Sequence, residues 1–156
     1  MPHRAQILGI AALAFPLCAV WADQPVKSQT VNGVKVELVE VKRDSPSQIT
    51  IRWRYHNDTE ETRRLTSETS GALDPYRLAL NSYVVDDQSQ TKYPVAHDSH
   101  NDPMASKNGR PNEFITIYPK ATIQTWAKFP VPESVGSVTV VIEGVPPFPR
   151  ILVPHP

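Results

Sequence analysis

The stretch that decides the fold is Gln48-Ile49-Thr50-Ile51-Arg52-Trp53-Arg54-Tyr55-His56. Apolar side chains occupy the odd positions from Ile49 to Tyr55, and polar side chains occupy the even positions. Strict alternation, rich in β-branched and aromatic residues, predicts an antiparallel strand with one face buried and one face in solvent. We therefore expect Trp53 in the core and both arginines, Arg52 and Arg54, on the outer face.

Short strands are also predicted on either side of this segment. Between residues 33 and 42 the apolar positions are even up to Leu38 and odd from Val39, which predicts a β-bulge or a change of sheet. The other predicted strands lie at 63–69, 76–85, 91–96, 114–117, 122–129, 137–143 and 151–153. No long segment has helical spacing of apolar residues.

About seven or eight short strands separated by turn residues predict an all-β fold, an antiparallel immunoglobulin-like β-sandwich. A closed barrel is the alternative. Trp53 then corresponds to the core tryptophan common in such sandwiches.

Composition narrows the class of protein. The 156 residues suffice for one ordinary domain. There are 16 basic residues (Lys and Arg) and 16 acidic residues (Asp and Glu), so the net charge is zero. This argues against a protein that binds nucleic acid through an overall excess of positive charge. A single cysteine excludes a disulfide framework and a multi-cysteine zinc site. With 16 prolines and 6 glycines, a helical bundle is disfavoured.

The N-terminus has the layout of a secretory signal peptide. Arg4 precedes an uncharged stretch at 7–20, which is shorter than the about 20 residues of a membrane-spanning helix. Val20 and Ala22 are the small residues at −3 and −1 of a cleavage site after Ala22. An uncleaved anchor and lipidation at Cys18 are the alternatives, although Leu17 fits the lipidation pattern poorly.

These features predict a signal peptide at 1–22, a flexible leader at 23–32 and the β-sandwich domain at 33–156. The product is expected in the periplasm or the medium, with no transmembrane segment in the mature chain.

Three stretches resemble a group of small exported bacterial proteins of uncharacterised function. They are Ile49 to Asn57, Tyr83 to Asp87 continuing to Lys92-Tyr93-Pro94-Val95 and Asp98, and Thr125 to Pro130 with Pro146-Pro147-Phe148. That group is similar in fold to the mycobacterial secreted immunoprotective antigen. The resemblance implies an immunoglobulin-like fold over most of residues 33–153 and implies no catalytic residues. The 97–108 segment departs from it in being rich in His, Asn and Asp.

The densest set of possible metal ligands lies in the 97–104 segment. Imidazole suits copper and zinc, thioether suits copper(I), and oxygen ligands suit calcium. The spacing matches no known ligand loop, so we expect a solvated loop and no cofactor. The residues concerned are His97, Asp98, His100, Asn101, Asp102 and Met104.

Signals for catalysis are weak, and we expect no enzyme. No Gly-x-Ser-x-Gly motif occurs, and the predicted mature chain lacks cysteine. The acidic pairs Asp86-Asp87 and Glu60-Glu61 are adjacent residues whose side chains point apart, whereas glycoside hydrolysis needs two converging carboxylates. Asn57-Asp58-Thr59 fits the N-glycosylation pattern.

The candidate binding residues are Arg52, Arg54 and Trp126. Trp126 shares a strand face with Gln124 and Lys128, so it is predicted to point outward, where a tryptophan beside basic residues often anchors a partner. Two other interpretations are a tryptophan packed beneath a loop and a solvated basic face that deters aggregation. Arg63 and Arg64 lie on the next predicted segment, and Glu37, Glu60 and Glu61 are available to neutralise these basic residues.

The favoured hypothesis is an exported, non-enzymatic binding module of the bacterial envelope. Its partner would be an envelope or extracellular protein or an anionic glycan. A periplasmic metal-handling protein that uses the 97–104 loop, and an enzyme with an unrecognised site, are the alternatives.

Overall fold

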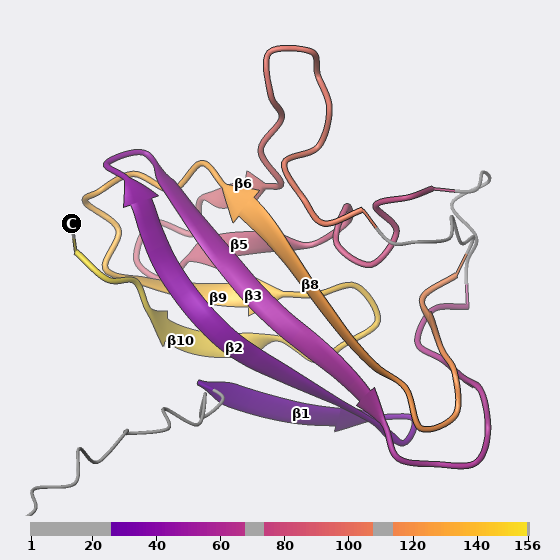
Figure 1. Ribbon diagram of the computed structural model, residues 1–156. Helices are drawn as coiled ribbons and strands as arrows, with labels where there is room; N and C mark the ends of the chain where they lie inside the picture. The colour runs from indigo at the N-terminus through magenta and orange to yellow at the C-terminus, as the bar shows by residue number, and fades with distance from the viewer. Residues whose placement is uncertain (1–25, 68–73, 108–113, 156) are drawn as a thin grey trace, which may run out of the picture.

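The computed structural model of the chain describes residues 26–67, 74–107 and 114–155. These residues form an all-β protein, and no helix occurs among them (Figure 1). The predicted signal peptide and its cleavage site lie outside the described residues. The strands are β1 Lys27–Val31, β2 Val34–Ser45, β3 Gln48–Asn57, β4 Arg63–Arg64, β5 Tyr83–Asp86, β6 Lys92–Pro94, β7 Thr116–Ile117, β8 Thr122–Phe129, β9 Ser137–Val141 and β10 Phe148–Leu152.

Eight of the ten strands form two antiparallel sheets that pack face to face. Their orders are β1-β2-β3-β8 and β10-β9-β5-β6, and the two-residue strands β4 and β7 form a separate ribbon. If β2, β3 and β8 are assigned as strands A, B and E, then β5, β6, β9 and β10 take the places of C, C′, F and G, which is an immunoglobulin-like order. The sandwich prediction is confirmed, and the separate sheets exclude the closed barrel.

One apolar core fills the space between the sheets. It receives Trp53 and Tyr55 from β3, Phe129 from β8 and Phe148 from β10, all at most 1% exposed. Burying each such side chain contributes about 1.5–3 kcal/mol. The predicted core position of Trp53 is confirmed. However, Trp53 lies on the B-position strand, whereas the antibody-type core tryptophan lies on strand C.

The predicted flexible leader at 23–32 is wrong for residues 27–31, which form β1 and pair with β2 from Val31↔Val34 to Lys27↔Leu38. Asn32 and Gly33 connect the two strands with φ of 48° and 78°, as a two-residue hairpin turn of type I′ requires. The Gln29 side chain also donates to the carbonyl of Pro147, 3.2 Å away, and so ties β1 to the loop before β10.

The predicted change of phase in 33–42 is a β-bulge. The register of β2 on β3 runs as Leu38↔Trp53 and then Glu40↔Arg52, which leaves Val39 as the extra residue. The strand predicted at 76–85 begins only at Tyr83, because residues 75–81 form turns. The proline-rich tail supplies β10, an edge strand, as the prolines lead one to expect.

Asn57 is the last residue of β3, and its side chain hydrogen-bonds to the two loops next to the end of that strand. Its side chain is fully buried, and its amide nitrogen donates to the carbonyls of Glu61, Ile117 and Tyr118 at 2.8–3.0 Å. Its Oδ1 accepts from the backbone and the hydroxyl of Thr59. The predicted glycosylation acceptor is thus a buried structural group, and the folded chain has no room for a glycan there.

No helix among the described residues is long and apolar enough to cross a membrane.

Candidate functional site

The outer surface of the β1-β2-β3-β8 sheet carries the predicted binding residues. Successive residues of a strand point to opposite faces, and the register of β3 with β2 and β8 arranges the outer side chains in rows across three strands. We call this surface the charged face. Its rows are Lys35, His56 and Thr122; Glu37, Arg54 and Gln124; Glu40, Arg52 and Trp126; and Lys42, Thr50 and Lys128. Asp44 adjoins the last row.

The bulge at Val39 determines which side chains of β2 reach this face. Glu37 and Glu40 are three residues apart, so in a regular strand they would point to opposite faces. The extra residue restores the phase, and Glu40 comes to lie opposite Arg52. Bulges commonly redirect side chains beside functional sites.

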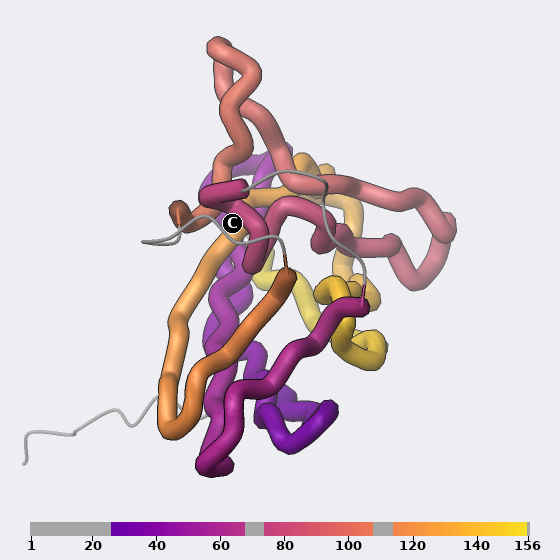
Figure 2. The backbone as a smooth tube through the Cα atoms, turned by 90° about the vertical axis from the view of Figure 1, so that its right-hand side faces the viewer, coloured from indigo at the N-terminus to yellow at the C-terminus, as the bar shows by residue number. Residues whose placement is uncertain are grey.

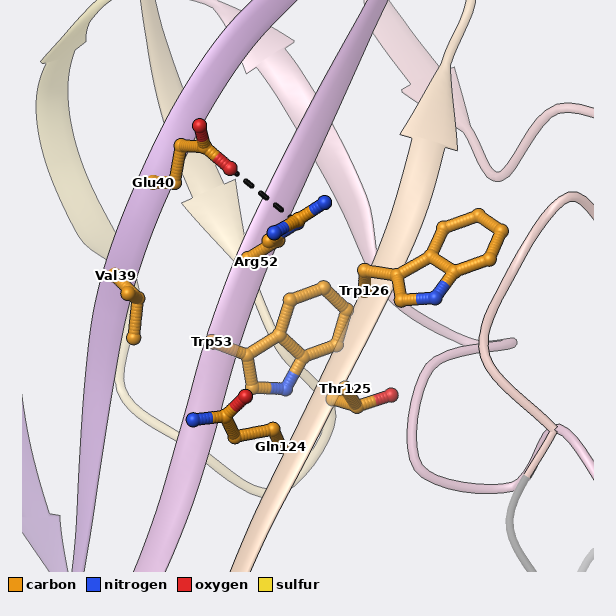
Figure 3. A pocket seen from close by; sticks show the side chains of 7 residues that line it. All are labelled: Val39, Glu40, Arg52, Trp53, Gln124, Thr125 and Trp126. Atoms are coloured by element: carbon orange, nitrogen blue, oxygen red, sulfur yellow. Dashed lines mark ion pairs between the residues drawn. The ribbon is translucent and has the colours of Figure 1, made fainter.

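The central row is Glu40, Arg52 and Trp126, one residue from each of three neighbouring strands (Figure 3). Arg52 Nε lies 3.3 Å from a carboxylate oxygen of Glu40. The side chain of Arg52 is 62% exposed, and Trp126 is 36% exposed, a high value for so large an apolar residue. The predicted outward position of Trp126 is confirmed.

Two hollows flank this row and share its three residues. One, of about 260 Å³, is lined also by Val39 and Gln124, with the buried residues Trp53 and Thr125 as its floor (Figure 3). The other, of about 190 Å³, is lined also by Lys42, Asp44, Thr50 and Lys128. A third hollow of about 290 Å³ lies among Lys35, Glu37, Arg54, His56 and Thr122. The charged face is therefore furrowed along the strands.

Carboxylates hold the remaining cations of the face. Glu37 binds Arg54 at 2.5 Å and Lys35 at 2.7 Å. The hydrogen bond from Arg54 is the main reason that the pKa of Glu37 lies below its usual value. Asp44 binds Lys128 at 3.2 Å. Burial raises the pKa of Asp44, but the hydrogen bonds from Thr50 and Lys128 outweigh it and lower the net value.

Three carboxylates thus serve five cations. Glu37 and Asp44 are each shared between two basic side chains, so the charged face has an excess of positive charge. The chain as a whole is neutral. This local excess favours an anionic partner.

The predicted neutralising role is right for Glu37, which pairs with Arg54, and for Glu61, and it is wrong for Glu60. Glu61 pairs with Arg63, and Glu60 pairs with Lys120, in the loops at the far end of β3. The carboxylate that pairs with Arg52 is that of Glu40. The sequence held no signal for this pairing, because it depends on the register between two strands. The prediction does hold that Arg52, Arg54 and Trp126 share one surface.

The 97–104 loop extends from one end of the sandwich (Figure 2). Its acidic group is engaged locally, because Asp98 Oδ1 accepts from the backbone nitrogens of His100 and Asp102 at 2.8 and 2.9 Å. His97 and His100 are exposed. Across residues 26–67, 74–107 and 114–155, no three His, Cys, Asp or Glu side chains are placed to hold a metal ion.

Acidic side chains elsewhere have structural partners. Asp87 accepts from the hydroxyls of Ser137 and Thr139, and Asp86 accepts from Ser89. Glu143 binds the buried Arg77 through two oxygens. Burial raises the pKa of Glu143, but the hydrogen bonds from Arg77 and Asn81 outweigh it, so the net pKa lies below the usual value.

In comparisons with known proteins, no family model, no curated protein and no solved structure matches the chain.

Proposed function

We propose that this chain is a non-enzymatic binding module, exported to the bacterial envelope or the medium, which binds its partner through the charged face. The observation that carries the proposal is the central row, in which the exposed Trp126 lies beside Arg52 over two shared hollows. Tryptophan and arginine are the residue types that most often dominate binding energy at interfaces.

The rest of the face supports the same proposal. The backbone of this face is fixed by paired strands, and ion pairs hold several of its side chains in place before binding, which lowers the entropic cost of association. The excess of positive charge favours approach by a negatively charged surface. Export is supported by the features of residues 1–22, which resemble a cleaved signal peptide.

Cross-linked capture tests the proposal. The tagged full chain is expressed with its own N-terminal segment in a bacterial host, and proteins cross-linked to it are recovered from envelope and medium fractions. Trp126→Ala and Arg52→Gln are each compared with the unaltered chain. We expect a discrete partner whose yield falls about tenfold with Trp126→Ala, the loss of one interface anchor.

Matched controls come from exposed residues outside the rows of the charged face. Tyr118→Ala removes an aromatic side chain that is 54% exposed, and Arg150→Gln removes an exposed positive charge from β10. Equal loss of the partner with a control and with Trp126→Ala would contradict the proposal. The mass of the exported protein tests the location, since cleavage after Ala22 predicts a chain that begins at Asp23.

A further inference from the structure

We infer that the charged face binds a linear acidic glycan, with a carboxylated sugar ring stacked on Trp126 and its carboxylate bound by Arg52. This inference rests on the proposed function and names its ligand class. It selects a glycan as the ligand in preference to an acidic protein, which the positive charge of the face alone would also favour.

Arg52 has the donors for a carboxylate. Its side chain is 62% exposed, and its ion pair with Glu40 is made by Nε. Among the described residues, no hydrogen bond from its two terminal nitrogens is present. A planar guanidinium with both terminal nitrogens accessible matches a carboxylate through two parallel hydrogen bonds.

Trp126 offers the apolar surface for a ring. It is the only large apolar side chain of the described residues that is exposed on the charged face, and polar groups surround it. Protein interfaces usually have several apolar anchors around a desolvated centre. A sugar ring needs only one apolar anchor, because a single aromatic face covers its C–H groups while polar neighbours bind its hydroxyls.

Glu40 and Gln124 supply those polar neighbours. Both line the hollow of about 260 Å³ together with Arg52 and Trp126. A drug-sized ligand occupies roughly 300–1,000 Å³, so this hollow is suited to a single ring. Glu40 accepts hydrogen bonds, and the amide of Gln124 both donates and accepts them, which is what hydroxyl groups require.

The hollows along the strands accommodate a chain. Along β3, the row of Thr50 and Lys128 precedes the central row and the row of Arg54 follows it, each about 7 Å away. The second hollow shares Glu40, Arg52 and Trp126 with the first. A linear polymer that follows β3 would place neighbouring units in consecutive hollows, and repeated carboxylates would meet the excess positive charge.

Isothermal titration of the full chain with three probes tests the inference. The probes are hexagalacturonate, which has rings and carboxylates; maltohexaose, which has rings alone; and hexaglutamate, which has carboxylates alone. We expect hexagalacturonate to bind at least about tenfold more tightly than either of the others, since both contacts contribute. We expect Trp126→Ala and Arg52→Gln each to weaken it about tenfold, and Tyr118→Ala and Arg150→Gln to leave it unchanged.

Equal binding of hexagalacturonate and hexaglutamate would overturn the inference, because the carboxylates would then act alone. So would binding that survives Trp126→Ala, or no binding of hexagalacturonate at millimolar concentration. Circular dichroism of each variant confirms that it is folded. Failure here is distinct from failure of the proposed function: a captured protein whose yield depends on Trp126 would still establish the binding module.

Discussion

Arg52 on β3 lies directly opposite Trp126 on β8, and its Nε lies 3.3 Å from a carboxylate oxygen of Glu40 on β2. Two consecutive strands, β2 and β3, and the sequence-distant β8 therefore each place one side chain in a single row. Because buried residues fix the register of all three strands, this row is rigid. The proposed binding role depends on this row and on the scaffold that holds it.

Deleting Val39 tests whether the bulge serves the charged face. Without it, Leu38 and Val41 still point inward and Glu40 still points outward, so we expect the chain to fold with an unfolding free energy lower by less than about 2 kcal/mol. The hollow that Val39 lines should change shape, since bulges set local twist. Urea denaturation and the capture yield measure both effects. Partner binding that is unaffected in a folded deletion variant would show that the bulge has no role in recognition.

Asn57 tests how the loops are held. Asn57→Asp keeps the shape but places a carboxylate against the carbonyls of Glu61, Ile117 and Tyr118. We expect a loss of about 3 kcal/mol in the free energy of unfolding, the cost of unsatisfied buried groups. Urea denaturation measures it, with Gln88→Ala in an exposed turn as the control. A loss below 1 kcal/mol, roughly that of one ordinary hydrogen bond, would contradict this role.

Two glycines give a matched pair. Gly144 has φ of 75°, and a Cβ there would lie 2.4 Å from the backbone oxygen of Leu65. A Cβ on Gly136 would meet nothing within 4 Å. We expect Gly144→Ala to destabilise the protein by about 2 kcal/mol or more. Gly136→Ala should be neutral or stabilising by up to about 1 kcal/mol. Thermal denaturation of both variants checks this, and equal melting temperatures would refute it.

Glu143 contributes to the pH dependence of stability. Its pKa in the folded chain lies below 4.5, so the stability it confers is complete above the unfolded pKa and is lost as the pH falls through the folded value. Glu143→Gln leaves the buried Arg77 without its carboxylate and should cost about 3 kcal/mol at pH 7. The difference from the unaltered chain should shrink below about pH 4.5.

Urea denaturation at several pH values measures this effect. Glu60→Gln, at a carboxylate that is 83% exposed, controls for the loss of one negative charge. A difference between Glu143→Gln and the unaltered chain that stays constant from pH 7 to pH 3 would contradict the assignment.

Much of the sheet carrying the site could be predicted from local pattern. Alternation over 48–56 predicted both faces of β3, and the same rule placed Trp126 outward on β8. The change of phase after Leu38 predicted the bulge, because an extra residue leaves a trace in the period itself.

Other features needed information that a pattern of polarity does not carry. β1 was missed because its sequence is mostly polar and shows no clear alternation of polar with apolar residues. The Asn32-Gly33 pair between Val31 and Val34 is nevertheless a strong hairpin signal. The pairing of Arg52 with Glu40 was not predicted, because cross-strand pairing depends on register, which brings Glu40 near and leaves Glu60 at the far end of β3. The spacing of Leu78 and Leu80 imitates a strand, but residues 75–81 form turns in which Arg77, Leu78 and Ala79 are all buried.

The most direct test of the central claim is site-specific photo-cross-linking in living cells. A photoreactive phenylalanine analogue is placed at position 126 in one chain and at the exposed aromatic position 118 in another. The account predicts a discrete cross-linked product from position 126 in the envelope or medium and none from position 118. No product from position 126 in a folded, exported chain, or the same product from both positions, would contradict the claim that the charged face binds the partner.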